Sequence, residues 1–205
     1  MKEAILLLDM GNVVFHIDVD AFFVWLEKKS ATHQPGLRNA VMAQYTTYEQ
    51  GRTTTAEFLQ HLRSSLHLNF LDSEFTGEWN NIWRADMPGV SGLMAEAAAV
   101  MPLYCLSNSN EMHARDMIPT RPQLKNFRKI YLSHELGMAK PDPAIYRHVC
   151  EDLGCAPERI WFFDDVAENV ESARRVGMQA HLFESAGQIR RVLGLPDKKI
   201  NEVEK

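Results

Sequence analysis

The sequence is poor in features that mark several classes of protein. Only three of its 205 residues are cysteines, and they form no CxxC pair and no metal-ligand spacing: Cys105, Cys150 and Cys155. Such isolated thiols are typical of a reducing compartment, so we expect buried cysteines in a cytoplasmic protein. No apolar run approaches the length of a membrane span, and the first predicted strand begins too near Met1 to leave room for a signal peptide.

An excess of one charge is also lacking. The 22 basic and 27 acidic residues give a net charge of −5, and the chain contains no block of lysine and arginine. This balance argues against a nucleic-acid surface, and we expect neither nucleic acid nor a membrane as a partner. Internal repeats and the nucleotide-binding patterns GxxxxGKS/T and GxGxxG are absent from the sequence as well. We expect a globular monomer or homodimer.

The residues that are present form alternating strand and helix patterns. The stretch 5–8 is apolar without polar alternation, which is typical of a parallel strand covered on both faces, and a β-prone flap follows at 13–17. Further strands are predicted at 103–106, 130–132, 160–163 and 180–183, and helices at 91–100, 110–117, 143–153, 166–176 and 186–193, with a loop at 118–127. The sequence thus predicts an α/β fold with a doubly wound parallel five-stranded sheet.

A long interval after the flap shows helical periodicity and no strand pattern. Apolar faces recur there at 22–26, 37–45, 58–66 and 75–83. Thr54, with Glu57 three residues later, predicts a capping box for the third of these helices. We therefore predict an α/β core made of residues 1–17 and 87–205, with a small four-helix cap inserted at 18–86.

Polar residues follow three of the predicted strands. Asp9 comes directly after the first, Ser107 and Asn108 follow the second, and Asp164 and Asp165 follow the fourth. In open α/β sheets, ligands bind at the carboxyl ends of the strands. These side chains are therefore expected to converge on one site.

Their chemistry matches the needs of phosphoryl transfer. Such a site needs an ionised nucleophile, a hard cation, hydrogen-bond donors and a fixed positive charge. Asp9 would supply the nucleophile, Asp9 with Asp165 two carboxylates for Mg²⁺, Ser107 a donor, and Lys140 the charge. Each feature also has a structural explanation, since a Ser-Asn pair or Asp164 can cap the helix that follows it.

The ordered set resembles the four motifs of the haloacid dehalogenase superfamily of aspartyl-nucleophile hydrolases. The matching stretches are 9–13, 106–108, 137–143 and 163–169, and the resemblance covers residues 4–193. The chain looks most like the sugar-phosphatase branch that includes α-glucose-1-phosphate phosphatase, and it is similar to the phosphatase domain of soluble epoxide hydrolase. The resemblance implies a Rossmann-like core with a helical cap inserted after the first motif.

The resemblance also implies catalytic roles. Asp9 would attack phosphorus and become an aspartyl phosphate. Ser107 and Asn108 would bind the transferring oxygens, and Lys140 would neutralise Asp9 and the phosphate. The implied partner is a small phosphate ester.

Mg²⁺ is the cofactor that the resemblance implies. Its ligands would be Asp9, Asp165, Asp164 and the backbone carbonyl of Gly11, with Asn169 as a supporting residue. The carbonyl role needs no side chain, so glycine can keep it.

Gly11 departs from the pattern of most phosphatases in this superfamily, which carry a second aspartate at this place as general acid and base. A general acid contributes typically 10²–10⁴-fold to a rate. His16 and Asp18 lie in the adjacent flap and are candidate substitutes, and His16 is also a candidate for binding substrate. A partly exposed flap histidine and a helix-capping aspartate are the stronger explanations of the two residues. We expect slow or narrow catalysis on a comparatively good leaving group, such as a sugar anomeric oxygen.

The cap is expected to set specificity. The loop 49–53 faces the active site in the resembled family, so Arg52 is a candidate for binding a substrate hydroxyl, unless it is a solvated loop residue. Tryptophans at helical spacing either fill the cap core or stack on a sugar: Trp25, Trp79 and Trp83. Three residues after the second motif are candidates for the site entrance: His113, Arg115 and Arg121.

Three functions remain open on the sequence. The first is a Mg²⁺-dependent phosphatase of a small phosphorylated metabolite, in particular a sugar phosphate. The second is a hydrolytic haloacid dehalogenase, which needs no acid for a halide but has no use for the Asp164-Asp165 pair. The third is a catalytically weak phosphoacceptor or binding protein, which the helical insert disfavours.

Overall fold

The sheet has the architecture that the sequence predicts. The computed structural model describes residues 4–30 and 33–195, and its parallel sheet has the order β5-β4-β1-β6-β7. The strands span the following residues: β1 Ile5–Leu8, β4 Leu103–Ser107, β5 Ile130–Leu132, β6 Ile160–Asp164 and β7 Gln179–Leu182. Because β1 lies between β4 and β6, the three strands that carry polar motifs end next to one another.

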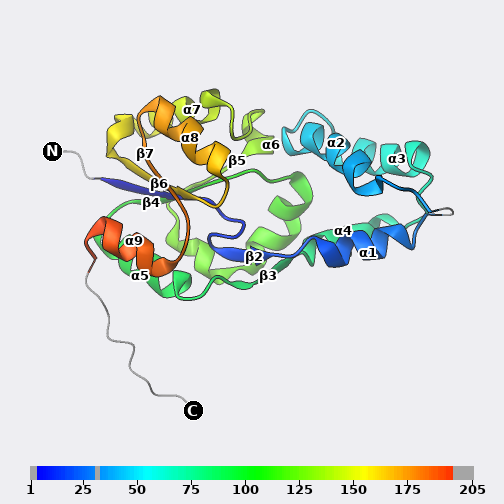
Figure 1. Cartoon of the computed structure of the whole chain (residues 1–205), viewed down its shortest axis with the longest axis horizontal. Helices are drawn as coiled ribbons and strands as arrows, with labels where there is room; N and C mark the ends of the chain where they lie inside the picture. The colour runs from blue at the N-terminus through cyan, green and yellow to red at the C-terminus, as the bar shows by residue number, and fades with distance from the viewer. Residues whose placement is uncertain (1–3, 31–32, 196–205) are drawn as a thin grey trace, which may run out of the picture.

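Helices cover both faces of the sheet, with α7 and α8 on one face and α5 and α9 on the other (Figure 1). Their bounds are α5 Val90–Val100, α7 Pro143–Leu153, α8 Ala167–Val176 and α9 Ala186–Leu193. Successive β1 side chains point to opposite faces. Leu7 therefore packs with α7 and α8 residues, whereas Leu6 and Leu8 pack with those of α5 and α9. Burial on both faces explains the apolar run without polar alternation.

Four helices between β2 and β3 form a lobe beside the sheet, called the helical lobe below (Figure 1). They are α1 Asp20–Glu27, α2 Leu37–Glu49, α3 Thr55–Ser65 and α4 Asp72–Asn80. The capping box of α3 is confirmed, because Thr54 Oγ accepts from the Glu57 N–H and the Glu57 carboxylate accepts from the Thr54 N–H. The apolar faces meet in an aromatic cluster that includes Phe22, Phe75 and Trp79.

The prediction of helix up to Trp83 is wrong. α4 ends at Asn80, and β3 (Trp83–Asp86) pairs antiparallel with β2 (Phe15–Ile17). Trp-Arg-Ala-Asp alternates apolar and polar residues over only four positions and has a single large apolar side chain, so this strand depends on its partner rather than on its own pattern. The predicted boundary between the cap and the core falls after residue 86. It therefore assigns β3 to the cap and its partner strand β2 to the core. Residues 1–3 and 196–205 of the predicted core lie outside the described residues.

The segment after β4 also differs from its prediction. The expected helix at 110–117 contains a π-helical turn, His113–Met117, and the expected loop contains two 3₁₀ turns, Ile118–Thr120 and Pro122–Asn126. Two short elements were not expected: α6 Ser133–Leu136 and the 3₁₀ turn Pro157–Arg159. Among the described helices, none combines the length and apolar character that crossing a bilayer requires.

Candidate active site

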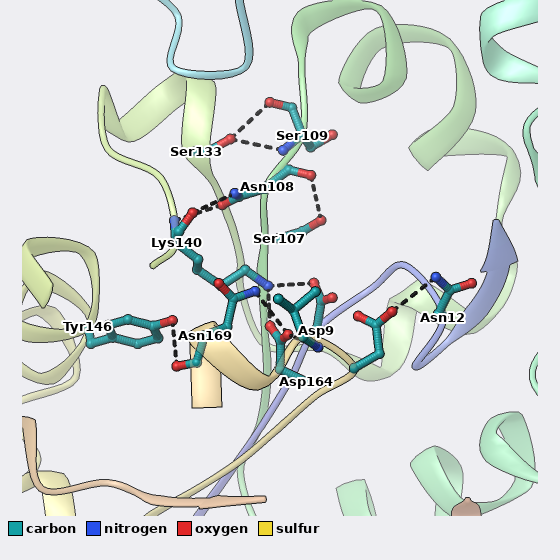
Figure 2. Close-up of polar contacts among 12 residues, drawn as sticks. Asp9, Asn12, Ser107, Asn108, Ser109, Ser133, Lys140, Tyr146, Asp164 and Asn169 are labelled. Carbon is teal, nitrogen blue, oxygen red and sulfur yellow. Dashed lines mark hydrogen bonds and ion pairs between the residues drawn. The ribbon is translucent and has the colours of Figure 1, made fainter. Parts of the chain in front are cut away.

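Three polar side chains meet at the carboxyl edge of the sheet. Asp9 follows β1 directly, and Ser107 and Asp164 are the last residues of β4 and β6. The backbone N–H of Asp9 donates to the carbonyl of Phe163 at 2.9 Å, so the sheet itself fixes the base of this side chain. All three residues are buried, and Figure 2 shows the two aspartates converging on the ammonium group of Lys140.

Lys140 forms the centre of the cluster. Its Nζ lies 2.7 Å from Asp9 Oδ1 and 2.6 Å from Asp164 Oδ2, and its side chain is only 1% exposed. Burial opposes the charge, but Asp9 and Asp164 together raise the pKa of Lys140 above its ordinary value. The site therefore contains a fixed positive charge in contact with the predicted nucleophile.

Asn108 fixes the main chain of Lys140. Its Nδ2 donates to the Lys140 carbonyl and its Oδ1 accepts from the Lys140 N–H, both at 2.9 Å. This two-way bridge connects the end of β4 to the segment that carries Lys140, which has no strand of its own. Asn108 was predicted to bind substrate; it lines the cavity described below, and its observed contacts make it a positioning residue.

Asp164 is fully buried and committed to protein contacts. Oδ1 accepts from the N–H of Val166 and from Nδ2 of Asn169, both at 2.9 Å, while Oδ2 accepts from Lys140. One carboxylate thereby positions the start of α8 and the lysine. Asn169 holds Asp164 in place, and its own backbone carbonyl accepts from the Tyr146 hydroxyl at 3.0 Å.

Asp165 is less enclosed and faces the same site. Its Oδ2 accepts from Asn12 Nδ2 at 3.0 Å, and burial raises its pKa above the ordinary value. Asn12 adopts a left-handed conformation, with φ of 51°, and its Oδ1 accepts from the N–H of Ile17. Asparagine tolerates this conformation better than most residues. The sequence analysis assigned Asn12 no role, although its place in the turn after Asp9 was a usable clue.

The carboxylates suit a hard divalent cation. Asp9, Asp164 and Asp165 each offer an oxygen within 4.8 Å of the others. Burial raises the pKa of Asp9, Lys140 lowers it, and Asp164 raises it further. Full ionisation would place three carboxylates against one ammonium group, an excess of two negative charges. Because Asp164 is committed elsewhere, Asp9 and Asp165 are the carboxylates that fit Mg²⁺, which accepts few protein ligands.

A cavity of about 410 Å³ opens above this cluster. Its base contains Asp9, Gly11, Ser107, Lys140 and Asp165. Its walls come from the flap and the helical lobe, and they contain mainly apolar side chains: Ile17, Phe23, Met42, Trp79, Ile82 and Trp83. The cavity therefore joins the polar cluster to a largely apolar chamber.

Two predicted substrate-binding residues do not line this cavity. Arg52 is an exposed residue of the loop after α2, and His16 is exposed on β2. Strand alternation explains the second case, because Ile17 lines the cavity in place of its neighbour His16. Asp18 pairs with Arg84 at 3.3 Å and accepts from the N–H of Asp20.

The three residues predicted to line the site entrance lie in different environments. His113 lines the cavity, stacked on Trp79 with ring centroids 5.5 Å apart. Arg115 is exposed and pairs with Asp116, while Arg121 donates to the carbonyls of Trp83 and Arg84. Trp79 and Trp83 are buried and also line the cavity, whereas Trp25 packs only within the helical lobe.

A buried chain of hydrogen bonds links the helical lobe to the core, and sequence reasoning missed it. Asn110 Nδ2 donates to the Tyr45 hydroxyl at 3.1 Å and contacts His113 Nδ1 at 2.9 Å. The Tyr45 hydroxyl also interacts with the Glu49 carboxyl group, and this interaction lowers the pKa of Glu49. Burial raises the pKa of Glu49 to about 7, with Lys140 acting in the opposite direction. Glu49, rather than Arg52, is thus the loop residue whose charge interacts with the site.

A buried aspartate at a strand end, paired with a lysine and next to a second carboxylate on a Rossmann-like sheet, is the arrangement that the resemblance to the haloacid dehalogenase superfamily implied. The sequence model of the haloacid dehalogenase-like hydrolase family matches residues 4–177 of this chain. The chain belongs to this family.

Relatives of known activity include phosphatases. The chain is 24% identical over 204 residues to D-ribitol-5-phosphate phosphatase of Bacteroides thetaiotaomicron, covering 90% of this chain and 94% of that protein. It is 27% identical over 192 residues to drimenol cyclase drtB of Aspergillus calidoustus, covering 92% of this chain but 35% of the relative. It also covers only 27% of phosphatase MT3486 of Mycobacterium tuberculosis, with 47% identity over 58 residues. The chain thus spans about a third or less of these last two relatives.

A solved structure shares the architecture. The haloacid dehalogenase family enzyme bt-2542 of B. thetaiotaomicron, in complex with magnesium and inorganic phosphate, superposes with a TM-score of 0.76 at 26% identity. The match covers 90% of this chain and 96% of that enzyme. The family match and the shared α/β fold identify the chain as a haloacid dehalogenase-like hydrolase.

Proposed function

We propose that the protein is a Mg²⁺-dependent phosphatase that hydrolyses a small phosphate monoester through an aspartyl phosphate on Asp9. The observation that carries this proposal is the contact of 2.7 Å between Asp9 and Lys140 at the base of the cavity, beside Asp165. A nucleophile for phosphorus must be accessible from a substrate cavity and must have its charge balanced. The phosphatase relative and the neighbour's complex with magnesium and phosphate support the same chemistry.

The residues divide the reaction between them. An oxygen of Asp9 forms a bond to phosphorus, the ester P–O bond breaks, and the departing alkoxide takes a proton. Water then attacks phosphorus, the bond to Asp9 breaks, and phosphate and the free carboxylate result. Lys140 holds Asp9 and balances charge on the phosphate, and Ser107 offers a hydroxyl donor.

Mg²⁺ would be held by Asp9, Asp165 and the carbonyl of Gly11, with Asp164 and Asn169 in support. When bound there, it supplies positive charge against the two excess negative charges and orients the phosphate.

The missing general acid has no evident substitute among the flap residues. Gly11 carries no side chain, and neither His16 nor Asp18 lines the cavity. We infer that the leaving oxygen takes its proton from water, which fits the predicted slow or narrow catalysis. The sugar-phosphate prediction draws no support from Arg52, which also lies outside the cavity.

The alternative functions are less well supported. A haloacid dehalogenase would have no use for Asp165 as a metal ligand, and two solved dehalogenases similar to this chain are 17% and 18% identical, a level that indicates shared fold only. A phosphoacceptor protein would not need an apolar cavity above the carboxylate. A cytoplasmic location, the absence of nucleic-acid and membrane partners, and a monomeric or homodimeric state stay predictions.

Phosphate release from acetyl phosphate and a panel of monoesters tests the proposal. Wild-type protein should turn over in Mg²⁺ and stop in EDTA, and Asp9→Asn should lower the rate at least 10³-fold. Asp72→Asn, on an exposed residue of α4 far from the cavity, is the matched control. Activity that survives Asp9→Asn would rule out the assigned nucleophile, and halide release from a haloacid without Mg²⁺ would favour the dehalogenase.

A further inference from the structure

The chamber above the nucleophile has little capacity to bind a sugar. We propose that the organic group of the substrate is apolar, an aromatic or branched-aliphatic alcohol esterified to phosphate, rather than a polyol. This inference rests on the proposed function and names the substrate class of the same site. The volume of about 410 Å³ lies toward the lower end of the range of about 300–1,000 Å³ for ligand pockets, so the group is compact.

The walls offer apolar surface that is held rigidly. Trp79 packs edge-on against Phe22 with ring centroids 4.7 Å apart, against Tyr45 at 5.1 Å, and stacks on His113. Such interlocked rings keep a fixed shape, so the wall is formed before a ligand arrives. Met42 is 39% exposed and adds a flexible apolar side chain to the same chamber.

The polar atoms of the lobe side are already engaged. The Tyr45 hydroxyl accepts from Asn110 and interacts with the Glu49 carboxyl group. His113 Nδ1 accepts from Asn110, and its Nε2–H donates to the Trp79 carbonyl at 3.3 Å. Burial lowers the pKa of His113 to about 3, so the ring is neutral and has no further proton to give.

Because these polar atoms already have partners, few hydrogen-bond donors and acceptors remain for a polyol. Among the described cavity-lining side chains of the helical lobe and β3, the indole N–H groups of Trp79 and Trp83 are donors without a partner. They can serve one or two oxygens, but they cannot accept from substrate hydroxyl groups. Each substrate hydroxyl that becomes buried there without a hydrogen-bond partner costs about 1–3 kcal/mol.

Charge is also confined to the edge of the chamber. Arg38 is the one charged residue that the described helical lobe contributes to the lining. Its exposed guanidinium pairs with Asp20 at 2.7 Å and lies 4.7 Å from the Phe23 ring centroid. At the base, Ile17 covers Gly11, where an added Cβ would meet Ile17 Cγ1 at 3.2 Å. An apolar group thus occupies the space over Gly11 at the base of the cavity.

Phosphates of primary alcohols test this inference, because their leaving groups have similar reactivity. We expect kcat/KM for benzyl phosphate and 3-methylbutyl phosphate to exceed that for ribitol 5-phosphate and glycerol 3-phosphate at least tenfold. Equal or higher values for the polyol phosphates would overturn the inference and leave the proposed function standing. Failure to hydrolyse any ester or acetyl phosphate would overturn the proposed function and this inference with it.

Two matched variants locate the preference in the chamber. Met42→Gln introduces an amide of nearly equal size into the wall and should reduce the ratio of kcat/KM for benzyl phosphate over ribitol 5-phosphate at least fivefold. Val24→Gln makes a comparable change at an exposed α1 position outside the lining and should leave the ratio unchanged. An unchanged ratio in a folded Met42→Gln protein would contradict the inference. If that variant does not fold, the wild-type panel decides alone.

Discussion

At the scale of single residues, Asp164 determines whether the site is assembled. Its carboxylate accepts from Lys140, Val166 and Asn169 without contact with solvent. Without Asp164, Lys140 would keep only Asp9 as a carboxylate partner, and removing one partner of a buried ion pair costs about 3–5 kcal/mol. The residue is therefore a structural requirement of the site as well as a part of its charge balance.

Asp164→Asn should lower the free energy of unfolding by about 3 kcal/mol and abolish phosphatase activity. Urea unfolding followed by circular dichroism measures the first effect, and phosphate release the second. Asp116→Asn, which breaks the exposed pair with Arg115, is the matched control and should cost under about 1 kcal/mol. Equal losses in the two variants would contradict the role given to Asp164.

Glu49 provides a test of pH dependence. Burial raises its pKa to about 7 from an ordinary value of 4.5. As the pH rises above 4.5, the unfolded chain ionises while the folded chain keeps its proton, so this group removes stability between about pH 4.5 and 7. The stability that it contributes is fully present below pH 4.5.

Glu49→Gln cannot titrate and should lose less stability than the wild type between pH 5 and 8, by a difference on the order of 3 kcal/mol. The Gln side chain can still accept from the Tyr45 hydroxyl. Unfolding in urea at a series of pH values, in the presence of EDTA, measures the difference. Parallel profiles for the two proteins would show that the Glu49 carboxyl is not held in a desolvated position.

At the scale of elements, the contact between the helical lobe and α6 positions the loop after α2. Ser133 Oγ donates to the Glu49 carbonyl at 2.6 Å. Gly51 has φ of 65°, and an added Cβ there would collide with the carbonyl oxygen of His134. The backbones of the two segments therefore meet at a point where only glycine fits.

Gly51→Ala should destabilise the protein by more than 1 kcal/mol beyond Gly36→Ala and should lower kcat/KM, because the loop must move away from α6. Gly36 is the matched control, since its φ is 86° and an added Cβ meets nothing within 4 Å. Urea unfolding and steady-state kinetics measure the two effects. Equal effects of the two variants would show that the backbone conformation matters and the contact with His134 does not.

The elements also show what the sequence could predict. The five parallel strands, the four helices of the lobe and the capping box of α3 followed from periodicity and local motifs. β3 did not, because the alternation in Trp83–Asp86 is too short to separate it from the helix before it, and the strand is held by pairing with β2. The π-helical turn and α6 escaped prediction for the same reason, since tertiary contacts rather than local preference decide short segments.

At the scale of the whole molecule, contacts between segments far apart in the sequence hold the cluster around Asp9 and Lys140 together. The sequence predicted only some of the residues involved. The sequence indicated Asp9, Ser107, Asp164 and Asp165, because strand ends converge in a parallel sheet, and it indicated Lys140 through the family motif at 137–143. Asn12, Tyr45 and Asn110 were missed, since only the folded chain shows that their side chains bridge separate elements. His16 and Arg52 were chosen for their chemistry, and the orientation of the flap and the loop places them outside the cavity.

Cation binding should stabilise the whole fold. Ligand binding to the folded state at one hundred times its dissociation constant contributes about 2.7 kcal/mol. Mg²⁺ should therefore raise the melting temperature of the wild-type protein, and EDTA should reverse the rise. Differential scanning calorimetry of Asp165→Asn should show little response to Mg²⁺, with Asp72→Asn responding like the wild type. A full response in Asp165→Asn would remove Asp165 from the cation site.

Trapping the phosphorylated residue tests the central claim most directly. Protein incubated with acetyl phosphate and Mg²⁺ is quenched and reduced with borohydride, which converts an aspartyl phosphate into homoserine, and the peptides are identified by mass spectrometry. The account predicts homoserine at position 9 and at no other aspartate, and its loss in EDTA. Homoserine at another position, or phosphate release without any modification of Asp9, would contradict it.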